Sequence, residues 1–328
     1  MSSPVCVLGA GSWGTALAIV LARHGTPVVL LARTQEKARH MQTARENSDY
    51  LPGIELPECL RVRTDPDEAT GAAALVVALP CKALESVLPA LARHHPRLVI
   101  GASKGIHPDT LERPDHLLAR LMGGANIALL SGPSFASEVA RGLPTAITMA
   151  AADEGIAREA ACLFSDSSFR VYTSSDVTGV ALGGALKNVI AIAAGIAAGL
   201  ELGHNASAAL VTRGLAEICR LAEAEGAKRE TLMGLSGLGD LVLTCTGALS
   251  RNRKLGAALA RGLDLRSAQA QVGQVVEGVR TAQAASRMAD SHGVDAPIIN
   301  AVNDVIEGRL SAPEAVHRLM VRPGRSES

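Results

Sequence analysis

The sequence is poor in aromatic residues and carries no net charge. Phe, Trp and Tyr make up 2% of its 328 residues, and 32 Lys plus Arg balance 32 Asp plus Glu. Proteins that bind nucleic acid generally need a basic surface and aromatic rings that stack on bases, so we expect no nucleic-acid partner. Any anion-binding site in this chain must be a local one.

The sequence also lacks cysteine pairs and metal-ligand spacings. Its six cysteines form no Cys-x-x-Cys pair, which is typical of reduced thiols in a cytoplasmic protein. The adjacent His94 and His95 would point to different sides of a helix and make a poor pair of ligands. We therefore expect no bound metal.

Neither a leader nor a membrane segment is expected. The amino terminus has no basic residue ahead of its first apolar run, so the sequence predicts no signal peptide and a cytoplasmic location. Residues 180–200 are apolar over a length that could span a bilayer. However, Lys187 and Asn188 stand at the centre of this stretch and four glycines interrupt it, which argues against a membrane helix.

At 328 residues with 48% hydrophobic residues, the chain is long enough for two domains, which we expect at 1–176 and 177–328. In the first, short apolar runs alternate with helical periodicity, which predicts an α/β fold with a doubly wound, mainly parallel sheet. In the second, long Ala-, Leu- and Gly-rich segments predict an all-helical domain. Residues 41–73 are polar and predict no regular element. The predicted strands lie at 4–8, 28–32, 74–79, 97–102, 126–130, 145–150 and 169–173, and the predicted helices at 13–24, 82–94, 153–164, 177–202, 206–226, 251–261, 278–292 and 296–308.

A glycine-rich turn follows the first predicted strand. Gly9, Gly11 and Gly14 have the spacing Gly-x-Gly-x-x-Gly between this strand and an apolar helical run. Gly9 permits a tight turn, Gly11 lets the backbone approach a pyrophosphate, and Gly14 lets the helix pack on the strand. The amino end of the helix adds N–H groups that attract an anion. The turn therefore predicts a Rossmann-like domain that binds NAD or NADP.

A residue that follows the second predicted strand indicates which dinucleotide, NAD or NADP, the protein prefers. A carboxylate that bonds the ribose is expected about 20 residues after the motif, but Arg33 stands there instead. Arginine can face the 2′-phosphate of NADP, which favours NADP. Glu36 is close enough in the sequence to keep NAD open.

A lone lysine, Lys187, lies in the middle of the most apolar stretch of the chain. Burying an ammonium group without a partner is costly or lowers its pKa, so a chain that keeps one there is expected to use it. Gly183, Gly184 and Ala191 lie three or four residues away, and these small residues would permit close approach of a cofactor or a neighbouring helix. The alternative is a lysine whose charged end reaches solvent while the glycines serve helix packing.

Polar residues also follow two predicted strands and stand in two later segments. Ser103–Gly105 and Ser131–Ala136 each follow a strand of the first domain, at the edge of the sheet where ligands bind in this architecture. In the second domain, Asp240 follows a Gly-Leu-Gly sequence, and Ser250 is a candidate N-cap. Arg251 would then lie at a helix start that attracts an anion, where a guanidinium group suits a phosphate.

Together, these segments closely resemble NAD(P)-dependent glycerol-3-phosphate dehydrogenase of the bacterial type. The resemblance runs from Pro4 to about Arg318, and it rests on the order and spacing of the segments. They are Gly9–Leu17, Ser103–Gly105, Ser131–Ser134, Gly183–Asn188, Gly237–Leu241, Ser250–Arg253 and Gly273–Gly278.

The resemblance implies reversible reduction of dihydroxyacetone phosphate to sn-glycerol 3-phosphate by NAD(P)H, which supplies the backbone of membrane phospholipids. It also implies an all-α C-terminal domain of the 6-phosphogluconate dehydrogenase-like type and a homodimer. By the family pattern Lys187 is the proton donor and acceptor, and Asp240 and Lys104 are the other catalytic candidates. The substrate-binding positions are Lys104, Gly132, Ser134, Lys187, Asn188, Asp240, Ser250, Arg251 and Asn252. The cofactor-binding positions are Gly9, Gly11, Ser12, Trp13, Gly14, Arg33, Lys104, Ala136, Arg251, Val275 and Glu277.

This reaction requires a proton donor and acceptor, and Lys187 can serve as both. Hydride transfer to a ketone leaves an alkoxide, and the Lys187 ammonium can stabilise that charge and give the proton. In the reverse direction the amine must accept a proton, which requires a pKa well below the free value of about 10.4. Our hypothesis is that the Asp240 carboxylate bonds Lys187, orients it and moderates the fall in pKa that apolar surroundings and the positive Lys104 favour. We expect the active site in the cleft between the two domains.

Two other functions stay open on the sequence alone. One is a β-hydroxyacid dehydrogenase, which shares this architecture and its lysine–asparagine pair, and the other is a dinucleotide-sensing protein without catalysis. Asp240 and Ser250–Asn252, in their sequence contexts, favour the glycerol phosphate enzyme over the first. The presence of Lys187, Asp240 and Arg251 together argues against the second.

Overall fold

The structure is a computed structural model of the chain, and it describes residues 3–273 and 275–323. The chain forms two compact units, here called unit 1 and unit 2. Unit 1 comprises Met1–Lys104 and Glu112–Ala181, and unit 2 comprises Gly105–Leu111 and Leu182–Ser328. The functional boundary that we expect after residue 176 stays a prediction.

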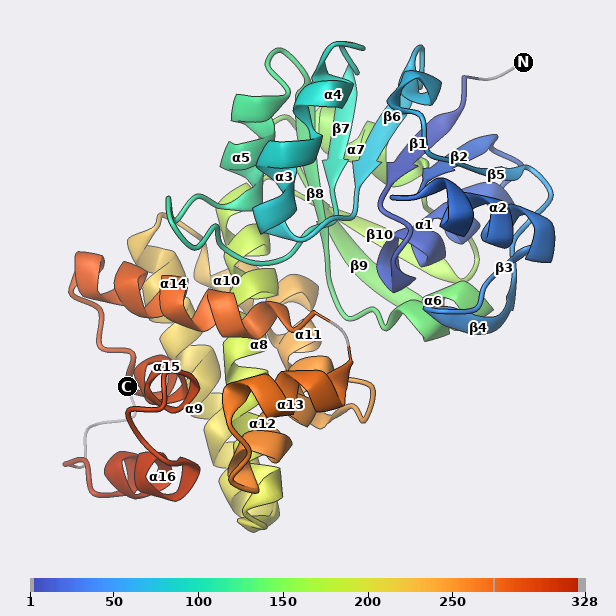
Figure 1. Ribbon diagram of the computed structural model, residues 1–328. Helices are drawn as coiled ribbons and strands as arrows, with labels where there is room; N and C mark the ends of the chain where they lie inside the picture. The colour runs from blue at the N-terminus through green and yellow to red at the C-terminus, as the bar shows by residue number, and fades with distance from the viewer. Residues whose placement is uncertain (1–2, 274, 324–328) are drawn as a thin grey trace. The chain divides into compact units, whose positions relative to one another are not determined.

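Unit 1 is built on one sheet whose strands follow the order β10-β9-β8-β7-β6-β1-β2-β5 (Figure 1). The strands from β8 to β5 in this order are parallel to one another, whereas β9 pairs with β8 in the antiparallel sense. A separate hairpin is formed by β3 and β4. The strands are β1 (Val5–Leu8), β2 (Val28–Leu31), β3 (Glu46–Asn47), β4 (Leu51–Glu55), β5 (Leu60–Arg63), β6 (Ala74–Val77), β7 (Leu98–Gly101), β8 (Asn126–Ser131), β9 (Thr145–Ala150) and β10 (Phe169–Ser174).

Alternate residues of the central strands enter two separate apolar cores, one on each face of the sheet. Val5 and Val7 of β1 lie in one core, and Cys6 and Leu8 lie in the other. Since side chains alternate along a strand, a strand that is buried on both faces is apolar at every position. The helices of the first core are α1 (Ser12–Arg23), α2 (Gln35–Ala44), α6 (Ala136–Arg141) and α7 (Glu154–Cys162), and those of the second are η1 (Pro66–Ala69), α3 (Cys81–Val87), α4 (Pro89–Ala92) and α5 (Pro114–Leu121).

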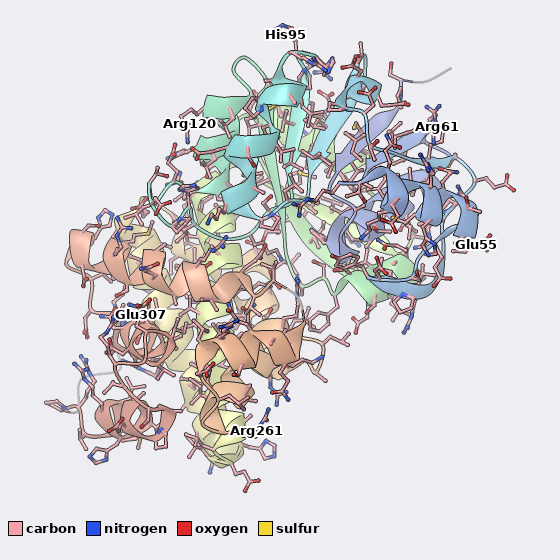
Figure 2. All side chains as sticks on the ribbon, viewed as in Figure 1. Glu55, Arg61, His95, Arg120, Arg261 and Glu307 are labelled. Atoms are coloured by element: carbon pink, nitrogen blue, oxygen red, sulfur yellow. The ribbon has the colours of Figure 1, made fainter. Side chains whose placement is uncertain are left out.

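This architecture confirms the predicted doubly wound, mainly parallel sheet. The helix predicted over 82–94 is two helices, α3 and α4, because Pro89 lacks an N–H donor and begins a new helix. The expectation that residues 41–73 form no regular element is wrong, because the end of α2 and the elements β3, β4, β5 and η1 lie there. β5 is an edge strand in which exposed Arg61 and half-buried Arg63 alternate with buried residues, so it has no continuous apolar run. Figure 2 shows Arg61 projecting away from the sheet.

Unit 2 is helical in its described part, as predicted, and its longest helix is α8 (Val177–Gly199), whose residues from Leu182 on belong to this unit. α8 has the length and the mean hydropathy, 1.8, of a membrane span, but its most apolar window of 18 residues is wholly buried inside the protein. This is the behaviour of a core helix of a globular protein. The other helices are α9 (Gly203–Ala224), α10 (Arg229–Leu232), the π-helix η2 (Leu235–Gly239), α11 (Asp240–Thr246), α12 (Arg251–Ala260), α13 (Leu265–Val272), α14 (Glu277–His292), α15 (Pro297–Ile306) and α16 (Ala312–Met320).

Two glycines let the backbones of α8 and α12 touch. A Cβ atom on Gly195 would lie 2.0 Å from the carbonyl oxygen of Arg253, and one on Gly256 would lie 2.0 Å from that of Ile192. No larger side chain fits at either position without moving a helix. This close contact holds the first turn of α12 beside the segment of α8 that carries the lone lysine.

A buried carboxylate joins α9 to α15. Glu217 is 2% exposed, and its side chain accepts hydrogen bonds from the backbone N–H groups of Ile298 at 2.8 Å and Ile299 at 3.1 Å. These donors belong to the first turn of α15, which has no cap of its own. Burial raises the pKa of Glu217 to about 7, although the two backbone bonds and the nearby Arg220 oppose the rise.

We expect Glu217 to make the unfolding free energy fall as the pH rises from about 4.5, its ordinary pKa, to about 7. In this window the unfolded chain has released a proton that the folded chain still holds, so stability falls by up to about 1.4 kcal/mol per pH unit. In Glu217→Gln this contribution disappears. Urea unfolding at about pH 5 and about pH 8 should show that wild type loses about 2.5 kcal/mol of unfolding free energy between these pH values relative to the variant. The exposed Glu307→Gln should show no such difference from wild type, and an equal result for the two variants would contradict this role for Glu217.

Candidate active site

The glycine turn of unit 1 has the geometry that a dinucleotide pyrophosphate needs. Gly9 has a φ of +112°, and a Cβ there would come within 2.7 Å of the Ala78 carbonyl oxygen. A Cβ on Gly14 would lie 1.9 Å from the carbonyl oxygen of Gly9. At Gly11, the N-cap of α1, a Cβ would meet nothing within 4 Å. The backbone is therefore tightly packed behind the turn and open at Gly11, which fits a phosphate at the start of α1.

The other expected cofactor residues of unit 1 also follow parallel strands. Ser12 and Trp13 form the first turn of α1 and are half-buried, and the Trp13 ring packs against the apolar core. Arg33 is exposed in the connection from β2 to α2. Ala136 begins α6, after β8. All four lie beyond the carboxyl ends of β1, β2 and β8, the edge that binds ligands in open α/β sheets.

Three expected substrate residues meet at one carbonyl oxygen of unit 1. The Lys104 Nζ donates to the carbonyl oxygen of Gly132 at 3.3 Å, and the Ser134 hydroxyl donates to the same oxygen at 3.0 Å. Lys104 follows β7 and Gly132 follows β8, which are neighbouring parallel strands. The two loops selected from the sequence are thus brought together, with an ammonium and a hydroxyl group on the same oxygen.

In unit 2 the lone lysine is buried and paired. Lys187 is 6% exposed, Asp240 1% and Thr244 5%. The Lys187 Nζ donates hydrogen bonds to the Asp240 carboxylate and, at 2.9 Å, to the Thr244 hydroxyl. The Thr244 hydroxyl in turn donates to the backbone carbonyl oxygen of Asp240 at 2.6 Å. The predicted hydrogen bond between Lys187 and Asp240 is therefore present, and a hydroxyl completes the arrangement.

A close backbone contact brings Asp240 to this position. A Cβ atom on Gly183, one turn before Lys187, would lie 2.7 Å from the carbonyl oxygen of Ser236 in η2. A Cβ on Gly237 would lie 2.0 Å from the carbonyl oxygen of Leu232. The π-helix η2 thus lies directly against α8, and α11 begins after it with Asp240. Single π-turns are often found at functional sites.

Lys187 and Asp240 form a buried ion pair in which each charge depends on the other for compensation. Removing one member of a buried ion pair costs about 3–5 kcal/mol, because the remaining charge is left without compensation in a medium that solvates it poorly. The Asp240 carboxylate lies against the Lys187 amine, and both side chains are almost completely buried. The pair therefore holds an amine and a carboxylate in contact where little solvent reaches them.

The residues that we expect to bind a phosphate lie at the start of α12. Ser250 is the N-cap of this helix, as predicted, and its hydroxyl accepts from the Arg253 N–H at 3.2 Å. Arg251 is exposed, and its guanidinium donates to the carbonyl oxygen of Val275 at 3.1 Å. Glu277 begins α14, two residues later. The structure thus brings Arg251 and Val275 together, and Glu277 follows in the same segment.

Two asparagine side chains connect this helix start to the lysine segment. The Gly278 N–H donates to Asn252 Oδ1 at 3.0 Å, and Asn252 Nδ2 donates to Asn188 Oδ1 at 2.9 Å. Asn188 Nδ2 is buried and has no partner among the described residues. A Cβ on Gly278 would lie 2.4 Å from Asn252 Oδ1, so α14 begins in contact with the asparagine chain. Asn188 and Asn252 are therefore fixed relative to Lys187.

Thr244 is the site residue that the sequence reasoning does not select. It lies four residues after Asp240 in α11, so both side chains share one face of the helix. That spacing is the signal that could have found it. A threonine at this position was not selected because its role depends on contact with Lys187, 57 residues earlier in the chain.

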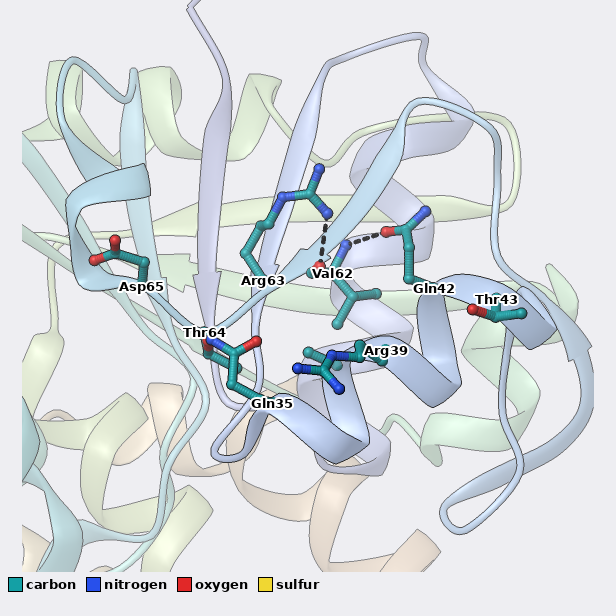
Figure 3. Close-up of a pocket in the computed structure, with 9 residues that line it drawn as sticks. Gln35, Arg39, Gln42, Thr43, Val62, Arg63, Thr64 and Asp65 are labelled. Atoms are coloured by element: carbon teal, nitrogen blue, oxygen red, sulfur yellow. Dashed lines mark hydrogen bonds between the residues drawn. The ribbon is translucent and has the colours of Figure 1, made fainter.

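One cavity of unit 1 contains none of these residues. It measures about 240 Å³ and lies between α2 and the edge strand β5, lined by Gln35, Arg39 and Arg63 among others (Figure 3). There the Gln42 side chain accepts from the Val62 N–H at 2.7 Å, which satisfies a donor of the edge strand. The cavity contains none of the expected site residues. No cluster of metal-binding side chains is found in residues 3–273 and 275–323.

Comparison with known proteins assigns both parts of the chain to one family. Residues 4–157 match the family described as "NAD-dependent glycerol-3-phosphate dehydrogenase N-terminus" and residues 176–317 match "NAD-dependent glycerol-3-phosphate dehydrogenase C-terminus". Proteins named glycerol-3-phosphate dehydrogenase [NAD(P)+] from Xanthomonas oryzae and Stenotrophomonas maltophilia are 48% and 49% identical to this chain. Each alignment covers 98% of this chain and 96% of the relative.

A solved structure agrees with these relatives. The crystal structure of glycerol-3-phosphate dehydrogenase from Coxiella burnetii superimposes with a TM-score of 0.94 at 38% sequence identity. The superposition covers 98% of this chain and 99% of that one. The ketopantoate reductase of Ralstonia eutropha, at 17% identity and a TM-score of 0.62, shares the fold alone. The chain belongs to the NAD-dependent glycerol-3-phosphate dehydrogenase family.

Proposed function

We propose that this protein reversibly reduces dihydroxyacetone phosphate to sn-glycerol 3-phosphate with NADH or NADPH. The observation that carries the proposal is the buried Lys187–Asp240–Thr244 arrangement in a member of this family. The matching relatives are named for NAD(P)-dependent glycerol-3-phosphate dehydrogenase activity. This favours the glycerol phosphate enzyme over the β-hydroxyacid dehydrogenase and the dinucleotide sensor.

The residues of unit 1 are proposed to bind and orient the dinucleotide. The open backbone at Gly11 and the N–H groups at the start of α1 receive the pyrophosphate, and Gly9, Ser12, Trp13 and Gly14 shape this turn. Arg33 is exposed after β2, where a 2′-phosphate would lie, so NADP is favoured. When bound, the nicotinamide supplies the hydride.

Lys187 is proposed as the acid and base of the reaction. In reduction its ammonium group stabilises the negative charge that develops on the substrate oxygen and then gives a proton to it. In oxidation the neutral amine accepts the alcohol proton. Asp240 and Thr244 hold the Nζ atom in one place, so little reorganisation is needed when the charge develops. Lys104, on the Gly132 carbonyl, is proposed as a second cation for the substrate.

The phosphate of the substrate is proposed to bind at the start of α12. Ser250, Arg251 and Asn252 form its first turn, where the helix dipole and a guanidinium group both attract a dianion. Asn188 Nδ2 and Ser134 are proposed to bind the polar groups of the substrate. Arg251, Val275 and Glu277 are proposed to contact the cofactor as well.

The oligomeric state, the location and the metabolic role of the protein are also proposed. We propose a homodimer, a cytoplasmic location and a role in supplying the glycerol backbone of phospholipids. They are supported by the resemblance of the sequence to the bacterial-type enzyme.

A substrate comparison tests the proposed function. The purified protein should consume NAD(P)H, followed by its absorbance, when dihydroxyacetone phosphate is added, and not when a β-keto acid is added. Comparing NADPH with NADH under the same conditions tests the role of Arg33, since we expect the lower KM for NADPH. Turnover of the β-keto acid alone would support the rival dehydrogenase, and turnover of neither substrate would contradict both enzymes.

Asp240→Asn should shift the pH dependence of the reaction to lower pH. Removing the carboxylate favours the neutral amine of Lys187 over the ammonium, because a buried ammonium then lacks its counter-charge. In reduction the protonated amine is the active form, so activity should be lost at a lower pH than in wild type. In oxidation the neutral amine is active, so activity should appear at a lower pH. Profiles of kcat/KM in both directions measure the shift, and unchanged profiles would contradict the role of Asp240.

A further inference from the structure

A buried asparagine outside the expected site lies behind the glycine turn. Asn47 of β3 is 1% exposed, and its Nδ2 atom donates to the carbonyl oxygen of Ala10 at 3.2 Å and to the Thr15 hydroxyl at 2.7 Å. Ala10 is the middle residue of Gly9-Ala10-Gly11, and Thr15 is a wholly buried residue of the first helical turns of α1. One side chain therefore bridges the turn and the helix that follows it.

The orientation of the Asn47 amide follows from its partners. A backbone carbonyl oxygen can only accept a hydrogen bond, so the atom of Asn47 that faces Ala10 must be the nitrogen. The other end, Asn47 Oδ1, is buried and has no donor among the described residues. A leucine would fill a similar volume without leaving a buried acceptor unpaired, which is normally costly. Packing alone does not explain an asparagine here.

The bond to Ala10 fixes one peptide plane of the dinucleotide turn. In a trans peptide the C=O and the following N–H point in opposite directions. Holding the Ala10 carbonyl towards Asn47 therefore directs the Gly11 N–H away from Asn47. Gly11 is the residue at which the backbone is open. The hydrogen bond to Thr15 connects the same amide to α1, the helix whose first N–H groups we propose to receive the pyrophosphate.

The segment that carries Asn47 is itself firmly held. Arg45, with a φ of +53°, is in the left-handed region that non-glycine residues seldom adopt. Its guanidinium donates to the carbonyl oxygens of Leu56, Pro57 and Leu60. The neighbouring Glu46 accepts from the Gly53 N–H at 2.9 Å. The hydrogen bonds of Arg45 and Glu46 therefore hold the backbone on the N-terminal side of Asn47 in place.

We propose that Asn47 is a positioning residue for dinucleotide binding, acting through the Ala10–Gly11 peptide and Thr15. It holds the Gly11 N–H in the direction that a pyrophosphate oxygen needs and so reduces the ordering that binding would otherwise require. It does not touch the reacting atoms, so its loss weakens cofactor binding and leaves the chemical step intact. This inference rests on the proposed binding of a dinucleotide.

The test is the affinity of Asn47→Leu for NADPH, measured by titrating cofactor fluorescence in the absence of substrate. We expect the Kd to rise about tenfold or more, as for the loss of a buried hydrogen bond. The KM for NADPH should rise in parallel, whereas kcat should stay within about twofold of wild type, because Asn47 does not touch the reacting atoms. Thr15→Val, which removes one of the two bonds with little change of shape, should show a smaller rise and provides a second variant if Asn47→Leu folds poorly.

Asn303→Leu is the matched control, because Asn303 is a buried asparagine of unit 2 whose Oδ1 is likewise unpartnered among the described residues. It should change the melting temperature without changing the Kd for NADPH. The inference is wrong if Asn47→Leu and Thr15→Val lower the melting temperature as the control does but bind NADPH as wild type does. If wild type itself binds no dinucleotide, the proposed function fails and the inference fails with it.

Discussion

The ion pair between Lys187 and Asp240 is the constraint on which the helical unit depends. Two charges that are almost completely buried must stay in contact, because either one alone would be strongly destabilising. Close contacts between backbone segments, and not bulky side chains, bring the two residues together. Gly183 lets η2 lie against α8, and α11 begins after it with Asp240 directed at the lysine. The Thr244 hydroxyl also accepts a hydrogen bond from the amine.

The same principle of close backbone contact organises the rest of the site in unit 2. The crossing of α8 and α12 is tight enough to exclude a Cβ at Gly195 or Gly256, and it fixes the helix start that carries Arg251. The chain of amides from Gly278 through Asn252 to Asn188 joins α14 to the same point of α8. Unit 1 uses a similar device at its glycine turn, where Asn47 supports the loop from behind. In each case small residues bring backbones together, and a buried polar side chain fixes their orientation.

Much of this could be predicted from the sequence because the signals are local. The buried strands have uninterrupted apolar runs, the glycine turn lies between a strand and a helix, and a lysine within an apolar helix is conspicuous. The partner of that lysine, Asp240, could be predicted only because a family pattern linked residues 53 positions apart. Thr244 and Asn47 could not, since each acts through contacts that only folding creates. The hairpin and edge strand of residues 46–63 could not be predicted because exposed residues, Pro52 and Gly53 in β4 and Arg61 in β5, interrupt their apolar pattern.

The most direct test of the account is turnover and cofactor binding by Lys187→Ala, because the central claim is that this buried ammonium moves the proton. The account predicts that turnover of dihydroxyacetone phosphate falls by about 10³-fold, as for loss of a general acid. The Kd for NADPH should stay close to that of wild type, because the glycine turn of unit 1 is unchanged. A folded Lys187→Ala variant that keeps about a tenth or more of wild-type turnover would contradict the account.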